Sequence, residues 1–179
     1  DRDDKPSRVE AEGLLSGIML DTRDFTLHTG VRTFEAAAFL RRNGADVTRV
    51  RKLFRENAAE YKAKADAVSQ AEIYRNAYAI SICHSEGIAS PTVVGAQAAN
   101  ELLDIRGVKA SFVLTEYQNK LFFSARSIDE VNVQVIMERM GGGGHLNIAG
   151  CQLENTSVEE GIIVLKRTLD KMIEEGEIS

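Results

Sequence analysis

Hydrophobic and polar positions divide the chain into a helical first part and a mixed second part. Apolar residues recur every three or four positions in "RVEAEGLLSGIM" (8–19), which predicts a helix. Thr33 is expected to cap a second helix, and Asp46 a third. Helical composition continues through "AAEYKAKADAVSQAE" (58–72). Residues 1–70 are therefore predicted to be mostly helix, without a sheet of their own.

From residue 71 onward, strand-like and helix-like segments alternate. A capping box, Ser157 with Glu160, opens the last helix. The predicted elements are a strand in 73–84, a helix in 90–105, two strands in 108–127 around a turn at 118–120, a helix in 129–140, a short strand near 149–153 and a helix in 157–175. The fold class is thus predicted to be α/β: a helical N-terminal segment (1–70), then a mixed-sheet α/β domain (71–179).

Composition narrows the choice of partners. The 179 residues carry a formal net charge of −5 and no apolar run long enough for a membrane span, so this segment is expected to make no membrane contact. Two cysteines, Cys83 and Cys151, are too few for a disulfide framework and are interpreted as reduced thiols of a cytoplasmic segment. The acidic balance argues against binding long nucleic acid. A basic cluster in 41–55 is interpreted as a solvated helix face.

The most unusual stretch is "MERMGGGGHLNIAGCQ" (137–152), with four consecutive glycines before a histidine. Glycines let backbone N–H groups converge into a nest that binds anions, and His145 can donate a hydrogen bond to a phosphate oxygen. Gly142, Gly143, Gly144 and His145 are therefore candidate phosphate-binding residues; the alternative is a flexible turn with a surface histidine. In "SARS" (124–127), Ser124 and Arg126 are weaker candidates, and Arg126 is equally well interpreted as an ordinary surface arginine.

Two stretches resemble DHH-family phosphoesterases. "SARSIDEVNVQVIMERMGGGGHLNIAG" is similar to the glycine–histidine region of the DHH-associated, substrate-binding domain. "GIMLDTRDFTLHTGVRTFEAAAFLRRNGADVTRVRKLF" is similar to the end of the DHH catalytic domain. Within this superfamily the chain looks closest to GdpP-type cyclic-di-AMP phosphodiesterases. Ile148 departs from the family pattern, where an alanine is usual, and either narrows a base pocket or turns into the core.

The resemblance also indicates what the chain lacks. The family's catalytic half carries His-x-Asp-x-Asp and Asp-His-His motifs that bind two manganese ions, and neither motif occurs in this sequence. Asp21, in "LDT", matches the last metal-binding aspartate, with a helix-capping aspartate as the alternative. One carboxylate does not hold a two-metal site. The chain is therefore expected to be a C-terminal fragment, with no complete catalytic set and no activity of its own.

The resemblance implies a parent enzyme, anchored to the bacterial cell membrane, that hydrolyses cyclic di-AMP to pApA. This chain would supply its nucleotide-binding half on the cytoplasmic side, and would bind a cyclic dinucleotide or a short oligonucleotide. One alternative is an oligoribonuclease or pAp phosphatase of the same superfamily. Another is a nucleotide-binding or dimerisation module without activity of its own; a homodimer is plausible on the apolar surface that a missing half would expose.

Overall fold

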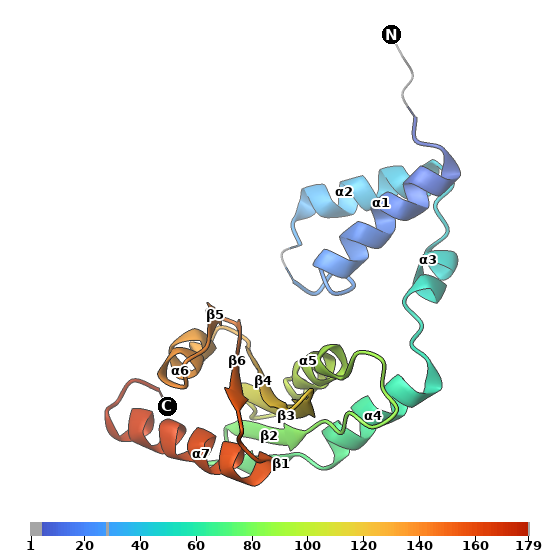
Figure 1. Cartoon of the computed structure of the whole chain (residues 1–179). Coiled ribbons are helices and arrows are strands. Elements are labelled where there is room, and N and C mark those ends of the chain that lie inside the picture. The colour runs from blue at the N-terminus through green and yellow to red at the C-terminus, as the bar shows by residue number, and fades with distance from the viewer. Residues whose placement is uncertain (1–4, 28, 179) are drawn as a thin grey trace. The chain divides into compact units, whose positions relative to one another are not determined.

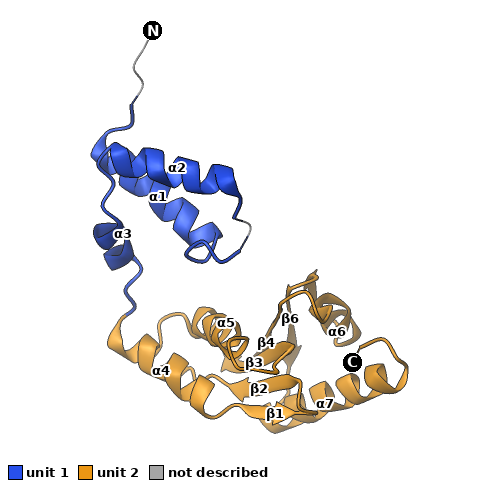
Figure 2. Ribbon diagram, turned by 180° about the vertical axis from the view of Figure 1, so that it is seen from behind, with its two compact units in different colours: residues 1–56 blue, residues 57–179 orange. Residues whose placement is uncertain are grey.

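The computed structural model describes residues 5–27 and 29–178, which divide into two compact units (Figure 2). The N-terminal unit is Asp1–Glu56 and the C-terminal unit is Asn57–Ser179. Helix α4 (Ala58–Ser69) packs on a helix of the C-terminal unit, and Ser81 donates a buried hydrogen bond to the carbonyl of Ala67 in α4. The boundary of the compact units thus lies before α4, whereas the sequence-based boundary lies after it.

The described residues of the N-terminal unit form three helices: α1 (Arg8–Asp21), α2 (Val31–Arg42) and α3 (Val47–Leu53). They enclose a small core of Ala11, Leu15, Met19, Leu40, Ala45 and Val50. Asp46 caps α3 as predicted, by accepting from the N–H groups of Thr48 and Arg49. The prediction that Thr33 caps α2 is wrong, because Gly30 is the N-cap and the Thr33 hydroxyl, one turn inside, accepts from the Gly30 N–H.

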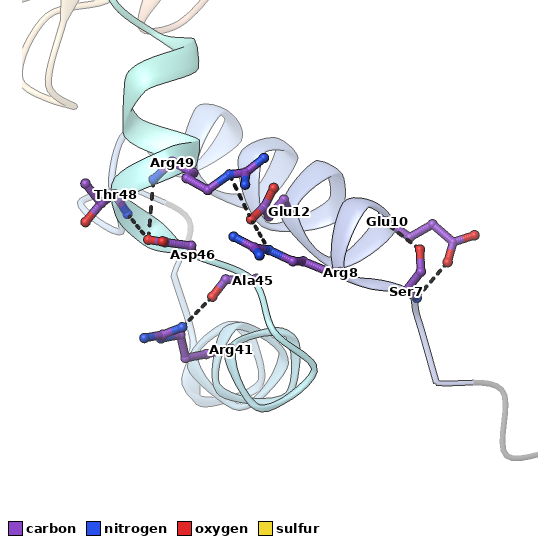
Figure 3. Close-up of polar contacts among 9 residues, drawn as sticks. All are labelled: Ser7, Arg8, Glu10, Glu12, Arg41, Ala45, Asp46, Thr48 and Arg49. Atoms are coloured by element: carbon purple, nitrogen blue, oxygen red, sulfur yellow. Dashed lines mark hydrogen bonds and ion pairs between the residues drawn. The ribbon is translucent and has the colours of Figure 1, made fainter.

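An ion-pair cluster joins α1 to α3. Glu12 is buried in α1, and its Oε1 lies 3.2 Å from Nε of Arg8 and 3.4 Å from Nε of Arg49 (Figure 3). Arg41 donates to the carbonyl of Ala45 at the start of the next connection. Two arginines of the basic 41–55 segment are thus used by the fold itself.

The C-terminal unit is built on a six-stranded mixed sheet with the order β1-β2-β3-β4-β6-β5 (Figure 1). Only β2 and β3 are parallel; every other neighbouring pair is antiparallel. The strands are β1 (Glu72–Tyr74), β2 (Tyr78–Ile82), β3 (Ala110–Tyr117), β4 (Lys120–Ser127), β5 (Gly143–His145) and β6 (Ile148–Glu154). The predicted mixed-sheet α/β fold is confirmed, with β1 and β5 as strands that the sequence analysis missed.

Helices cover the two faces of the sheet unequally. Helices α6 (Val133–Arg139) and α7 (Val158–Glu174) pack with residues of β2, β3, β4 and β6 into the larger core. On the other face, α4 and α5 (Pro91–Leu102) form a second core with Ala79 of β2 and Val113 of β3. Figure 1 shows α5 and α7 on opposite sides of the sheet.

No residue of β4, β5 or β6 among those described belongs to the second core. Helix α5 also lies against part of β4, whose residues on this side are half-buried, and the second core does not extend over β5 and β6. Successive side chains of a strand point to opposite faces of the sheet, and in β4 buried residues alternate strictly with half-buried ones. The half-buried residues of β4 therefore belong to the face opposite the larger core. We call this surface the open face. It carries Phe122, Ser124 and Arg126 of β4, Ile148, Gly150 and Gln152 of β6, and Gly143 and His145 of β5.

Candidate functional site

Strand register brings the predicted phosphate-binding residues together on the open face. In β4, β6 and β5, Arg126 lies opposite Ile148, and Ile148 opposite His145. Two positions away along each strand is a second row of facing residues, in which Ser124 lies opposite Gly150, and Gly150 opposite Gly143. Side chains directly opposite one another in antiparallel strands point to the same face, about 5 Å apart. Four of the six predicted substrate-binding residues therefore share one small area of sheet.

The first row combines two polar side chains with an apolar one. Arg126 is half-buried, and its Nη1 donates to the carbonyl of Ala125 at 2.8 Å, which restrains the guanidinium near the strand. His145 is exposed at the sheet edge. Between them Ile148 is 50% exposed, so of the two alternatives for this residue, the core position is wrong. Ile148 narrows the open face between the two polar groups.

The glycine run is not a loop. Gly141, with φ of 84°, and Gly142 end α6 in a Schellman motif: their N–H groups donate to the carbonyls of Glu138 at 3.0 Å and Met137 at 2.8 Å. Gly143–His145 is then an edge strand paired with β6. The prediction that the Gly142 N–H group belongs to an anion-binding nest is therefore wrong, because this N–H group already caps α6.

The four glycine positions differ in whether the fold would accept a side chain. A Cβ on Gly142 would collide with the Gly150 oxygen and would lie 2.7 Å from Cα of Cys151. A Cβ on Gly144, where φ is 151°, would lie 2.5 Å from Cα of Ala149. Gly143 has neither restriction: a Cβ there meets nothing within 4 Å and would project on the open face. The fold requires glycine at the other positions, but not at Gly143.

A polar cluster that the sequence analysis missed fixes the turn after His145. The Asn147 amide donates to Asp129 at 2.6 Å and accepts from the backbone N–H of Asp129 at 3.3 Å. The hydroxyl of Ser127, at the end of β4, is 3.2 Å from the same Asn147 amide oxygen. This cluster ties the β5–β6 turn to the β4–α6 connection and thereby positions His145. The only sequence signal was an asparagine between His145 and the predicted short strand near 149–153.

Asp21 belongs to the other compact unit. It is the last residue of α1 and is exposed, while Thr22 provides the cap by donating from its hydroxyl to the carbonyl of Ile18 at 2.7 Å. A carboxylate at the C-terminal end of a helix is opposed by the helix dipole, so end stabilisation does not explain Asp21. Beyond it, Arg23, Asp24 and Phe25 all have positive φ, which costs about 1–2 kcal/mol per non-glycine residue.

The residues of this chain do not fit a two-metal site by themselves. Within residues 5–27 and 29–178, no three His, Cys, Asp or Glu side chains come together as a metal ion would require. Asp21 offers one exposed carboxylate, and a hard divalent cation needs several oxygen or nitrogen ligands. Over the same residues, no helix combines the length and the apolar character needed to cross a membrane.

Comparison with known proteins agrees with the fold and the resemblance. The chain is 46% identical over 154 residues to the cyclic-di-AMP phosphodiesterase PdeA of Listeria monocytogenes, covering 86% of this chain and 23% of the relative. It is 43% identical to the cyclic-di-AMP phosphodiesterase GdpP of Geobacillus thermodenitrificans, covering 96% of this chain and 26% of that protein. The chain thus spans about a quarter of the length of these curated relatives.

Structural similarity extends beyond the sequence relatives. An exopolyphosphatase-related protein from Bacteroides fragilis superposes with a TM-score of 0.82 at 23% identity, covering 93% of this chain and 51% of that one. The model of the DHHA1 domain matches residues 76–175, which include every strand of the sheet except β1. The chain therefore belongs to the DHHA1 domain family.

Proposed function

We propose that this chain is the nucleotide-binding part of a manganese-dependent phosphodiesterase that hydrolyses cyclic di-AMP to pApA. The observation that carries the proposal is the Arg126–Ile148–His145 row on the open face, in a chain 41–46% identical to cyclic-di-AMP phosphodiesterases. Two free cysteines, Cys83 and Cys151, fit a reducing compartment, so we assign the segment to the cytoplasmic side of a membrane-anchored parent.

The chemistry of the row suits a phosphodiester. Arg126 carries a fixed positive charge and a planar fork of donors that matches phosphate oxygens. His145 offers a ring N–H from the other side of Ile148, and Ser124 a hydroxyl in the next row. Because Gly143 has no side chain, a phosphate oxygen approaches the strand backbone closely there. These groups bind and orient the nucleotide.

Bond cleavage is assigned to groups outside this chain. In the parent, Asp21 is the residue of this chain that would contribute to holding manganese, which would supply activation of water and stabilisation of negative charge on the phosphoryl oxygens. Since the described residues contain no cluster able to bind the metal, this chain alone should bind nucleotide without hydrolysing it. It would then act as a binding module, or as a dimerisation module if its exposed apolar residues, such as Leu20 and Leu53, meet a second copy.

Isothermal titration of the chain with pApA, cyclic di-AMP, pAp and a short oligoribonucleotide tests the proposal. Arg126→Ala should weaken pApA binding by roughly 10- to 100-fold, the effect expected for a charged hydrogen bond. Arg106→Ala is the matched control, because Arg106 is exposed in the turn after α5 and off the open face. Equal affinity of the Arg126→Ala and Arg106→Ala variants would refute the site. Tighter binding of pAp or the oligoribonucleotide than of either dinucleotide would favour the oligoribonuclease or pAp phosphatase alternative.

A further inference from the structure

A shallow hollow of about 360 Å³ lies beside the phosphate-binding rows. It is lined by Phe122 and Phe123 of β4, Gly150, Cys151 and Gln152 of β6, and Gly141 and Gly142 of the helix cap. The side chains of Phe123 and Cys151 belong to the core on the opposite side of the sheet. Their strands therefore contribute backbone to the floor, and Phe122 and Gln152 contribute side chains.

Phe122 and Gln152 face each other across β4 and β6 on the open face. Phe122 is half-buried and Gln152 is exposed. Gly142 and Gly150 contribute only backbone to the hollow, and both are packed closely, because a Cβ on Gly142 would collide with Gly150 and Cys151 and a Cβ on Gly150 with the oxygen of Phe123. The hollow thus offers an aromatic ring, an amide and a lining of strand backbone, which suit a planar heterocycle.

The hollow is in line with the phosphate-binding rows. Phe122 is two positions from Ser124 and four from Arg126 on the same face of β4, which is about 7 and 14 Å along the strand. A phosphate in the row of Ser124, Gly150 and Gly143 would therefore have its own base within reach of Phe122, and a dinucleotide would extend from there to the row of Arg126.

We propose that the hollow binds a nucleobase of the dinucleotide, with Phe122 stacking on the ring and Gln152 reading its edge. This inference rests on the proposed function and adds to it a base-selecting subsite. A glutamine amide pairs with adenine through one donor and one acceptor, at N7 and the N6 amino group. Guanine presents two acceptors at the corresponding edge, N7 and O6, and an arginine matches those. Gln152 therefore favours adenine.

Binding of pApA and pGpG to the chain and its variants tests this assignment. Phe122→Leu should weaken pApA binding by roughly 5- to 100-fold, because aromatic stacking is lost, while Phe122→Tyr, which keeps a ring, should retain it. Gln152→Arg should shift the ratio of pGpG to pApA affinity upward by at least about ten-fold. Tyr61→Leu is the matched control, since Tyr61 is an exposed aromatic residue on α4. Circular dichroism checks that each variant is folded.

The outcomes separate the two proposals. If the unmodified chain fails to bind pApA, the proposed function is refuted and the base subsite with it. If the chain binds pApA but Phe122→Leu binds it equally well and Gln152→Arg keeps the original base ratio, the base subsite alone is refuted. Should Phe122→Leu be unfolded, the Gln152→Arg base ratio decides, because an exposed side chain is replaced there without loss of packing.

Discussion

Alanine at Gly142 and alanine at Gly143 are expected to act on different properties of the protein. At Gly142, a Cβ would collide with the oxygen of Gly150 and Cβ of Cys151, both held in β6. Backbone atoms in a paired strand do not move aside as a flexible side chain does. At Gly143, a Cβ has open space and φ is not positive, so the fold accepts it.

The magnitude follows from these contacts. Overpacking costs about 1–3 kcal/mol, and the rigid neighbours of Gly142 put this variant toward the upper end. A loss of that size lowers the melting temperature by roughly 4–12 °C in a unit of this length. Gly143→Ala should leave the melting temperature unchanged or slightly higher, because alanine has less backbone entropy to lose than glycine. The same variant should weaken nucleotide binding, since its methyl group occupies the surface beside Ser124.

Thermal unfolding followed by circular dichroism, together with titration of pApA, measures both effects. Gly144→Ala serves as a second destabilised variant, since its φ of 151° and the contact with Ala149 both disfavour a side chain. Equal melting temperatures for the Gly142→Ala and Gly143→Ala variants would refute the explanation of the glycine run. Unchanged pApA affinity in Gly143→Ala, and also in the bulkier Gly143→Val, would refute the role of Gly143 on the open face.

Three further predictions concern the C-terminal unit. Burial raises the pKa of Cys151 to about 12 and also raises the pKa of Cys83. Iodoacetamide should therefore alkylate neither thiol of the native protein between about pH 8 and 10, but should alkylate both in urea. Fast alkylation of the native protein would contradict the burial of these thiols. Ser157→Ala should lower the free energy of unfolding by about 1 kcal/mol, because the Ser157 side chain caps α7. Ser90→Ala should lower it by almost nothing, because the Ser90 side chain makes no cap hydrogen bond. Equal losses for the two variants in urea unfolding would contradict this difference. Asn147→Ala should loosen the β5–β6 turn, because the hydrogen bond from Asn147 to Asp129 is lost. The variant should bind pApA several-fold more weakly while keeping its α-helical content. Undiminished affinity would show that this turn does not position His145.

Stability also depends on the raised thiol pKa values. A thiol whose pKa is higher in the folded state than in the unfolded state favours folding while both states are protonated. This contribution is complete below the ordinary thiol pKa of 9.0 and declines as the pH rises toward the folded value of about 12 for Cys151. The free energy of unfolding should therefore fall above about pH 9, and Cys151→Ala should show a smaller fall between about pH 9 and 11. An identical pH dependence in the variant would contradict this contribution.

Local signals along the chain were enough to predict most helices and the mixed sheet. Caps at Asp46 and Ser157 mark helix starts because their side chains bond to backbone groups a few residues away. Thr33 failed as a cap because a hydroxyl at the third helical position makes a similar bond from inside the helix. β1 escaped prediction because Arg75 and Asn76, both with positive φ, form a tight turn inside a segment that looked like one strand.

The sequence suggested candidate members of a site but not their geometry. Arg126 and His145 are 19 positions apart, and only the pairing of β4 with β6 and of β6 with β5 brings them onto one row. The glycine run suggested a loop because its composition suits one, whereas in the structure Gly142 caps α6 and Gly144 pairs with Ala149 of β6. Asn147 and Gln152 had no chemical motif around them, so their positions became meaningful only in the folded sheet.

The most direct test of the account is to map where a nucleotide touches the C-terminal unit. In two-dimensional NMR of the isotopically labelled chain, titration with pApA should shift the backbone amides of Ser124, Arg126, Gly143 and His145 together, at one dissociation constant. Amides of α7, on the opposite side of the sheet, should stay in place. Shifts confined to α7, or no shift at any of the four open-face amides at saturating pApA, would contradict nucleotide binding on the open face.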